Sequence, residues 1–209
     1  CGNASRCVAK YLYERGLTDK REIALDTKAG IKYLQLFIDP QTDTVQRVRV
    51  NMGTATVSSE SIPVISELPE VIDQPLTIDG KELRITCVSM GNPHAVIFMS
   101  DIDNLELDEI GPKIENHPMF PQRTNVEFIE VVDRNTFKMR VWERGSGETL
   151  ACGTGACASV VAGVLNNRCD TCVTVKLKGG DLDIEWDKTN NQVYLMGDAH
   201  FVFKGEIPD

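Results

Sequence analysis

The sequence predicts an α+β protein of two pseudo-symmetric domains, each with a curved sheet wrapped around one helix. Two observations predict this fold. Short stretches with the alternation or β-branched composition of strands outnumber helix-like stretches along the 209 residues. The sequence also contains an internal repeat, and each copy pairs a helix with several strands. Many strands around few helices favour sheets that bury a helix over helical bundles.

The repeat begins at two Cys-Gly turns, Cys1-Gly2 and Cys152-Gly153. A lone Cys-Gly turn is more often a small buried residue than a reactive one, but here the landmarks downstream are duplicated as well. Two pseudo-equivalent halves, each with one thiol, can place sulfurs on both sides of one carbon, which is the geometry of a two-base racemase or epimerase. The later landmarks are Gly30 and Gly180, which follow the cysteines by 29 and 28 residues, and then Met-Gly at 52–53 and 196–197.

The elements of the first copy follow from apolar spacing and turn residues. Residues 7–16 have helical spacing, and Gly16 is a typical C-terminal stop. Strand patterns follow around the Lys-Ala-Gly turn at 28–30, and a stretch rich in Ser, Pro and Glu at 54–75 is typical of a crossover. The predicted strands are 23–25, 31–38 and 45–52.

The rest of the chain contains two more helix-like stretches among further strands. Residues 105–114 have helical spacing, and residues 153–165 form the helix of the second copy. The Gly-Asn-Pro-His turn at 91–94 separates two strands. The predicted strands are 83–88, 95–99, 126–132, 137–143, 172–177, 182–186, 193–196 and a final strand at 200–203.

The crossover divides the chain into two domains. We expect residues 1–57 to form part of the first domain, with 200–209 as a returning strand, and residues 58–199 to form the second. The chain opens directly on the first Cys-Gly turn without an initiator methionine. We therefore expect further residues upstream, because a half-open sheet would expose unpaired strand edges.

Composition excludes several classes of partner. The net charge of −9 and the pI near 4.9 argue against nucleic acid and anionic membranes, since scattered basic residues form no stripe. No apolar run approaches the roughly 18 residues of a membrane span, and no signal peptide opens the chain. Seven cysteines without a disulfide spacing predict the cytoplasm. Cys169 and Cys172 have a C-x-x-C spacing but no second ligand pair, so no metal site is predicted.

The position of each thiol has a chemical rationale. Gly2 and Gly153 remove side-chain bulk beside the cysteines, and a helix begins close after each turn. The free N–H groups and positive dipole end of a helix N-terminus stabilise a thiolate or a carboxylate. Two such termini could hold an α-carboxylate while each thiol reaches one face of the α-carbon.

Five motifs, in order along nearly the whole chain, resemble those of diaminopimelate epimerase. This family implies two pseudo-symmetric domains, each a strand-rich barrel around a central helix, with the active site in the cleft between them. It also implies cofactor-independent interconversion of LL- and meso-2,6-diaminopimelate, a precursor of lysine and peptidoglycan. The motifs are Cys1-Gly2-Asn3 with Arg6-Cys7, then residues 91–94, 123–128, 142–145 and 151–157.

The resemblance implies a role for each matching residue. Cys1 and Cys152 would be the acid and base, exchanging roles with the direction of reaction. A guanidinium suits two-pronged binding of the distal carboxylate. His94 and Glu143 would line the site and take part in catalysis. The residues implied in substrate binding are Gly2, Asn3, Gly153 and Thr154 at the α-carboxylate, and Asn92, Asn125, Glu143 and Arg144 elsewhere on the substrate.

Other interpretations remain open from the sequence. A racemase of the same fold would keep both cysteines but bind another amino acid, and an inactive truncated fragment would only bind or scaffold. Asn92 could be a turn residue, His94 a buried hydrogen-bonded imidazole, and Glu143 with Arg144 an exposed ion pair. A homodimer is compatible with the sequence. Two departures from the family are Ala4, where Gly is frequent, and the absence of its upstream Gly-Asn-Asp-Phe segment.

Overall fold

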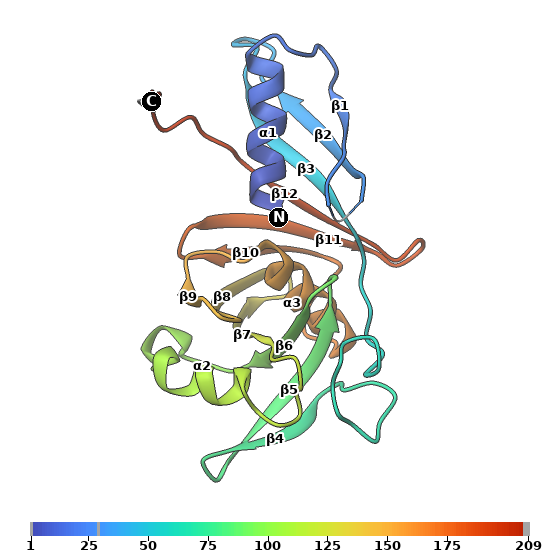
Figure 1. Ribbon diagram of the computed structural model, residues 1–209, viewed down its shortest axis with the longest axis vertical. Coiled ribbons are helices and arrows are strands. Elements are labelled where there is room, and N and C mark those ends of the chain that lie inside the picture. Colours follow the sequence, from blue (N-terminus) through green and yellow to red (C-terminus); the bar gives the residue numbers. More distant parts are fainter. Residues whose placement is uncertain (1, 29, 207–209) are drawn as a thin grey trace. The chain divides into compact units, whose positions relative to one another are not determined.

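A computed structural model describes residues 2–28 and 30–206 (Figure 1). Cys1, the first predicted catalytic residue, and Ala29, in the predicted repeat, lie outside the described residues. The described part contains three α-helices, one short 3-10 helix and twelve strands, which confirms the predicted α+β class. None of the described helices is long and apolar enough to cross a membrane.

The chain forms two compact units. Unit 1 comprises Cys1–Asn51 and Met196–Asp209, and unit 2 comprises Met52–Leu195. The chain enters unit 2 within strand β3 (Val45–Thr54) and returns within β12 (Gln192–Gly197), rather than in loops. The sequence-based domain division, at 57/58 and 199/200, stays a prediction.

Unit 1 places one helix against a small antiparallel sheet. Strand β2 pairs with β1 on one side and β3 on the other, with a bulge in the β2–β3 register. Apolar residues alternate along β2 and β3, so one face of the sheet is buried and the other is not. The elements are α1 (Gly2–Glu14), β1 (Glu22–Leu25), β2 (Lys32–Ile38) and β3 (Val45–Thr54).

The C-terminal turn of α1 is tied to the start of β3 by two side chains. Lys10 Nζ donates to Val45 O at 2.9 Å, and Val45 N–H donates to Glu14 Oε1 at 2.8 Å. Lys10 and Glu14 also form an ion pair one helical turn apart. These contacts hold α1 against the sheet although most of its residues are not buried.

Unit 2 is dominated by a large mixed sheet. Its strand order is β12-β11-β10-β8-β7-β6-β5-β4, and β9 pairs with residues 141–143 at the end of β8, beyond the residues 136–138 that pair with β10. The β6–β7 and β8–β10 pairs are parallel. The strands are β4 (Gln74–Ile78), β5 (Lys81–Ser89), β6 (Pro93–Phe98), β7 (Asn125–Asp133), β8 (Thr136–Glu143), β9 (Gly147–Thr149), β10 (Cys172–Leu177), β11 (Gly180–Asp187) and β12 (Gln192–Gly197).

The helix α3 (Gly153–Leu165) is the centre of unit 2. All nine residues from Gly155 to Gly163 are buried, so the helix is enclosed on every side. It contacts strands β5, β6, β7, β10 and β11. The sheet therefore wraps around one helix in this unit, as the sequence predicts.

The repeat is visible as a repeated order of elements, α1-β1-β2-β3 and α3-β10-β11-β12. Both helices have 13 residues, and each begins directly after the Cys of its turn. They also end alike. Leu17 and Arg168 each donate their N–H to the carbonyl five residues earlier, at 2.9 and 2.8 Å, while Gly16 and Asn167 adopt φ of 66° and 54°. The sequence repeat thus continues to the helix C-terminus, where Asn replaces the predicted Gly stop.

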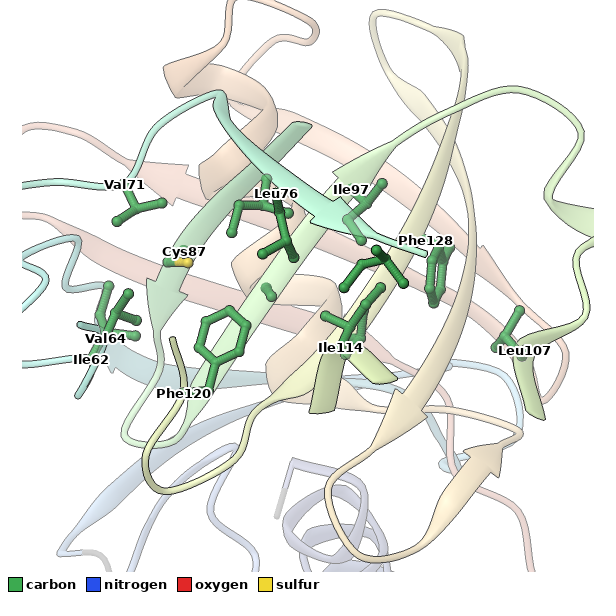
Figure 2. Packing of buried hydrophobic residues seen from close by; sticks show 14 of the residues in the cluster. Ile62, Val64, Val71, Leu76, Cys87, Ile97, Leu107, Ile114, Phe120 and Phe128 are labelled. Carbon is green, nitrogen blue, oxygen red and sulfur yellow. The ribbon is translucent and has the colours of Figure 1, made fainter. Parts of the chain in front are cut away.

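A second apolar layer lies between the sheet of unit 2 and the helix α2 (Leu107–Glu115). Leu107 and Ile114 belong to one buried cluster with Leu76, Ile97 and Phe128 from the strands (Figure 2). Phe128 is fully buried, and so is Ile114. This layer closes the outer face of strands whose other face contacts α3.

Two expectations about secondary structure are wrong. Residues 200–203 were predicted as a strand returning to the first domain, yet residues 198–206 have no regular secondary structure. Phe201 instead contacts α1 through its ring, edge-on to Tyr11 at 6.5 Å, with Lys10 and Arg15 over its face. A short run of aromatic and β-branched residues therefore suggested strand pairing where side-chain contacts hold the segment. The segment 54–75, predicted as a crossover, also includes the start of β4. Pro75 argues against a strand in the sequence, because proline cannot donate a backbone hydrogen bond to a neighbouring strand.

Replacing Gly111 with alanine should destabilise unit 2. A Cβ at this position of α2 would lie 2.4 Å from Trp142 Cδ2. The indole cannot swing aside freely, because its Nε1 donates to Glu115 Oε2 at 2.7 Å. Overpacking typically costs ~1–3 kcal/mol and the helix gains up to ~1 kcal/mol from alanine, so we expect a net loss of about 1–2 kcal/mol in urea unfolding. Glu109→Ala on the exposed face of α2 is the control, and an equal effect there would refute the packing argument.

Candidate active site in unit 2

Cys152 is the residue immediately before the first turn of α3. Its backbone is extended, with φ −128° and ψ 106°, and its carbonyl accepts the first intrahelical hydrogen bond from Ala156 N–H at 2.9 Å. The N–H groups of Gly153 and Thr154 precede that bond and are oriented as helix N-terminal donors. A Cβ at Gly153 would be only 3.1 Å from Leu195 Cδ1, so glycine permits close packing here.

A chain of polar side chains leads from the Cys152 sulfur into the interior. Cys152 Sγ lies 3.5 Å from Thr154 Oγ1, which accepts from Asn92 Nδ2 at 3.3 Å. Asn92 Oδ1 lies 3.1 Å from His94 Nε2. His94 Nδ1 in turn lies 2.7 Å from Glu127 Oε1. Four of the residues predicted to act in the site are thus brought together, and the chain ends on Glu127, for which no role was expected.

The inner end of this chain is inaccessible to solvent. The side chains of His94 and Glu127 are both 0% exposed. His94 is held by β6 and Glu127 by β7, which pair in parallel. The second oxygen of Glu127, Oε2, has no hydrogen-bond partner among the described residues. An unpaired charge is costly inside a protein, so the protonation of a buried carboxyl group depends on that of its polar partner.

Burial sets the ionisation of these groups. It raises the pKa of the Cys152 thiol to about 12, and the negative charge of Glu127 adds to the increase, whereas a hydrogen bond with Thr154 opposes it. Burial also raises the pKa of Glu127, although His94 opposes this shift. The sequence led us to expect that the helix N-terminus would favour a thiolate. Burial outweighs that effect, and Cys152 is a neutral thiol at pH 7.

Asn125 is engaged with the backbone. Its Nδ2 donates to Pro93 O at 2.8 Å, and its Oδ1 accepts from Arg144 N–H at 3.0 Å. It therefore joins the turn before β6 to the turn after β8. The role predicted for Asn125 in substrate binding stays a prediction, with one Nδ2 hydrogen remaining as a donor.

The end of β8 and the turn after it carry Glu143 and Arg144, and a hydrogen bond holds each of these side chains. Thr149 Oγ1 donates to Glu143 Oε1, and Arg144 Nη1 donates to Gln122 O at 2.9 Å. Both side chains are half-buried. They are not an ion pair with each other, in contrast to one of the open interpretations, because each has a different partner.

A second buried carboxylate, Glu115, anchors this turn. It is 5% exposed and accepts from Gly145 N–H at 2.9 Å, from Arg123 Nη1 at 3.0 Å and from Trp142 Nε1 at 2.7 Å. Both oxygens are thus satisfied, which avoids the cost of an unpaired buried carboxyl group. Glu115 thus fixes the segment that carries Glu143 and Arg144.

The equivalent turn of unit 1 is described from Gly2 onward. Gly2 is buried in the first turn of α1, and Asn3 Oδ1 accepts from Arg6 Nη2 at 3.2 Å. Arg6 Nε donates to Asp198 O at 3.0 Å. Arg6 is 7% exposed, which is unusual for an arginine, and it fastens the start of α1. Within the described residues, no group of three or more His, Cys, Asp or Glu side chains could hold a metal ion.

The sequence alone does not single out Glu127. It lies within the matched motif at 123–128, in the strand Asn125–Asp133, but the resemblance implied no role for it. A signal was present nonetheless, because a glutamate flanked by Val126 and Phe128 in a strand buried on both faces requires a partner.

Comparison with known proteins places this arrangement in a family. The sequence profile described as Diaminopimelate epimerase matches residues 86–202. A diaminopimelate epimerase of Acetivibrio thermocellus is 55% identical over 207 residues, which are 99% of this chain and 73% of that protein. One from Agathobacter rectalis is 52% identical over 214 residues, covering 99% of this chain and 74% of that protein.

A solved structure supports the fold. The crystal structure of a probable proline racemase from Agrobacterium radiobacter K84, with bound carbonate, matches with a TM-score of 0.68 and covers 98% of this chain and 66% of that one. Its 14% identity shows the fold alone. From the family profile, the identity to curated relatives and the repeated Cys-Gly helix starts, the chain belongs to the diaminopimelate epimerase family.

Proposed function

We propose that the protein interconverts LL- and meso-2,6-diaminopimelate by two-base proton transfer at the α-carbon, with Cys1 and Cys152 as the acid and base. The observation that carries the proposal is the Cys152 thiol at the start of α3, beside two helix N–H donors and the chain through Thr154, Asn92 and His94. An epimerase without an electron-sink cofactor needs such groups placed in advance.

The raised pKa of the Cys152 thiol supports a first role for it as the acid. With a pKa raised to about 12 by burial, this thiol is protonated at pH 7 and is ready to give a proton. In the proposed scheme Cys1, as thiolate, removes the α-proton from one face while Cys152 protonates the other. The roles are exchanged after turnover. Simultaneous transfer avoids a free carbanion, which would otherwise be too unstable to accumulate.

The first turn of α3 supplies the electrostatic part of the proposal. The N–H groups of Gly153 and Thr154 would bind the α-carboxylate, on which negative charge increases as the proton leaves. Gly2 and Asn3 would act in the same way at the start of α1. In this scheme each helix contributes donors that need no rearrangement during the reaction.

The distal end of the substrate would be bound by Arg144 together with Asn92, Asn125 and Glu143. Arg144 uses one nitrogen to hold Gln122 O, so its guanidinium is oriented while other N–H groups remain as donors. A guanidinium and a neighbouring carboxylate complement a second amino-acid terminus. This favours diaminopimelate over an amino acid with one charged end, the alternative left open by the sequence.

The setting we propose is the cytoplasm. All six cysteines that the structure describes are free thiols, and the proposed chemistry depends on reduced sulfur. The net charge of −9 argues against a nucleic-acid partner.

Reaction in deuterated water tests the two-base scheme. If each thiol serves one face, the early meso product from LL-diaminopimelate should carry deuterium at its inverted centre while recovered substrate remains nearly unlabelled. Mass spectrometry of both pools at low conversion measures this. Early label in recovered substrate would rule out one thiol per face, because a single exchanging base returns solvent hydrogen to the original face.

A further inference from the structure

The hydrogen-bond chain behind Cys152 can be oriented in two ways. An amide group has one donor end and one acceptor end, so Asn92 cannot donate to both Thr154 and His94. If His94 Nε2 carries hydrogen, it donates to Asn92 Oδ1, and Asn92 Nδ2 donates to Thr154 Oγ1. The Thr154 hydroxyl hydrogen is then free to point at the Cys152 sulfur, 3.5 Å away.

The opposite orientation follows when His94 Nε2 has no hydrogen. Asn92 must then turn its amide and donate to Nε2, and its oxygen accepts from the Thr154 hydroxyl. The Thr154 oxygen can now accept from the Cys152 S–H. The first orientation favours a thiolate at Cys152 and the second a thiol, because hydrogen bonds to the charged form favour that form.

The group that selects between these orientations is Glu127. Its contact of 2.7 Å with His94 Nδ1 lies inside the protein, with both side chains fully buried. When the two residues share one proton between Oε1 and Nδ1, His94 Nε2 keeps its hydrogen. When that proton is lost, the remaining hydrogen of His94 is held at Nδ1 by the Glu127 carboxylate, and Nε2 becomes an acceptor.

Glu127 packs closely against the helix α3. A Cβ at Gly155 would lie 2.6 Å from Glu127 Oε1, so only glycine lets α3 pack against this carboxyl group. The ionisable groups facing Glu127 come from four elements: His94 on β6, Cys87 on β5, Glu143 on β8 and Cys152 beside α3. Of these, His94 alone makes a hydrogen bond to it in the described residues.

We propose that Glu127 is a positioning residue that shares one proton with His94 and thereby sets the direction of the hydrogen bond between Thr154 and the Cys152 sulfur. The sulfur accepts that bond while the shared proton is present and donates it when the proton is lost. This rests on the proposed function, in which Cys152 alternates between thiol and thiolate. Glu127 couples the two states to a group that never touches substrate.

The reactivity of Cys152 in the substrate-free protein tests the coupling. Iodoacetamide alkylation is followed by mass spectrometry at a fixed, mildly alkaline pH, with the exposed Cys172 as internal reference. Four proteins are compared: wild type, Glu127→Gln, Thr154→Val and the double variant. The glutamine keeps the shape of Glu127 but cannot share a proton, and the valine interrupts the chain without changing charge.

We expect Thr154→Val to slow alkylation of Cys152 in the wild-type background, since the hydroxyl that stabilises the thiolate is gone. The same substitution should have a smaller effect in the Glu127→Gln background, by at least about twofold in rate, because the hydroxyl is no longer held in one direction there. Equal factors in both backgrounds would mean that Glu127 acts on Cys152 through space alone, and would overturn the proposal.

A second measurement covers the case in which Glu127→Gln does not fold. The chain contains three histidines, so ring nitrogen NMR signals can be assigned readily. Thr154→Val should shift the His94 signals and leave those of His117 and His200 in place. Unchanged His94 signals would overturn the proposal. Both experiments use protein without substrate, so they can fail while turnover of diaminopimelate stands, and succeed if it does not.

Discussion

Cys152→Ala should lower epimerisation of diaminopimelate by at least about a thousandfold, within the range that general acid–base groups contribute. The proposed scheme gives this thiol one face of the α-carbon, and its side-chain hydrogen-bond partner among the described residues, Thr154, offers only a hydroxyl in its place. Coupled assays or chiral chromatography of the two stereoisomers measure the loss. The protein should remain folded, because Cys152 is a small residue at a helix end.

The matched control is Cys7→Ala. Cys7 lies on α1, six residues after Cys1, and its side chain is exposed. Its removal should leave turnover within a factor of about two, in keeping with a surface substitution. Substantial turnover by Cys152→Ala, together with normal folding, would eliminate the two-thiol mechanism and favour a binding role for the turn.

Arg144→Lys should reduce kcat/KM for diaminopimelate by roughly tenfold to a hundredfold. Hydrogen bonds to charged groups contribute ~1.5–3 kcal/mol, and a lysine ammonium cannot reproduce a planar two-pronged contact. The lysine would also lose the Arg144 contact with Gln122 O at 2.9 Å, which orients the side chain. Steady-state kinetics separate a rise in KM from a fall in kcat, and we expect KM to carry most of the change.

Arg168→Lys is the control for that substitution. Arg168 is exposed, and its Cζ lies 4.9 Å from the centre of the Phe98 ring. It is not part of the hydrogen-bond chain that begins at Cys152. Its replacement should leave kinetics unchanged. An Arg144→Lys protein with normal kcat/KM would remove the main reason for preferring a two-ended substrate.

Much of the fold is predictable from local patterns. The helix α3 was expected at residues 153–165 and strand β10 at 172–177, and both are found at these positions. Their signals are strong because burial on all sides gives a long apolar run and exposure on one side gives alternation. The internal repeat predicted the same order of elements in both copies, and the order helix-strand-strand-strand does occur twice.

Other features depend on tertiary contacts that no local pattern contains. The strand β9 has three residues and forms along the end of β8, beyond the residues of β8 that pair with β10. The pKa of Cys152 depends on how deeply the first turn of α3 is buried, which the helix dipole argument ignores. The pairing of His94 with Glu127, 33 residues apart, follows from the parallel register of β6 and β7. Sequence motifs identified His94, and the fold supplied its partner.

The enclosure of α3 has a consequence for the order of events during synthesis. This helix is apolar on every side, and two of the strands it contacts, β10 and β11, follow it in the sequence. After α3 has left the exit tunnel and before β10 and β11 have followed, the helix has only part of its final surroundings, and its exposed apolar surface is open to aggregation or to chaperones. Unit 2 can therefore bury its central helix only after the strands of the second repeat have left the exit tunnel.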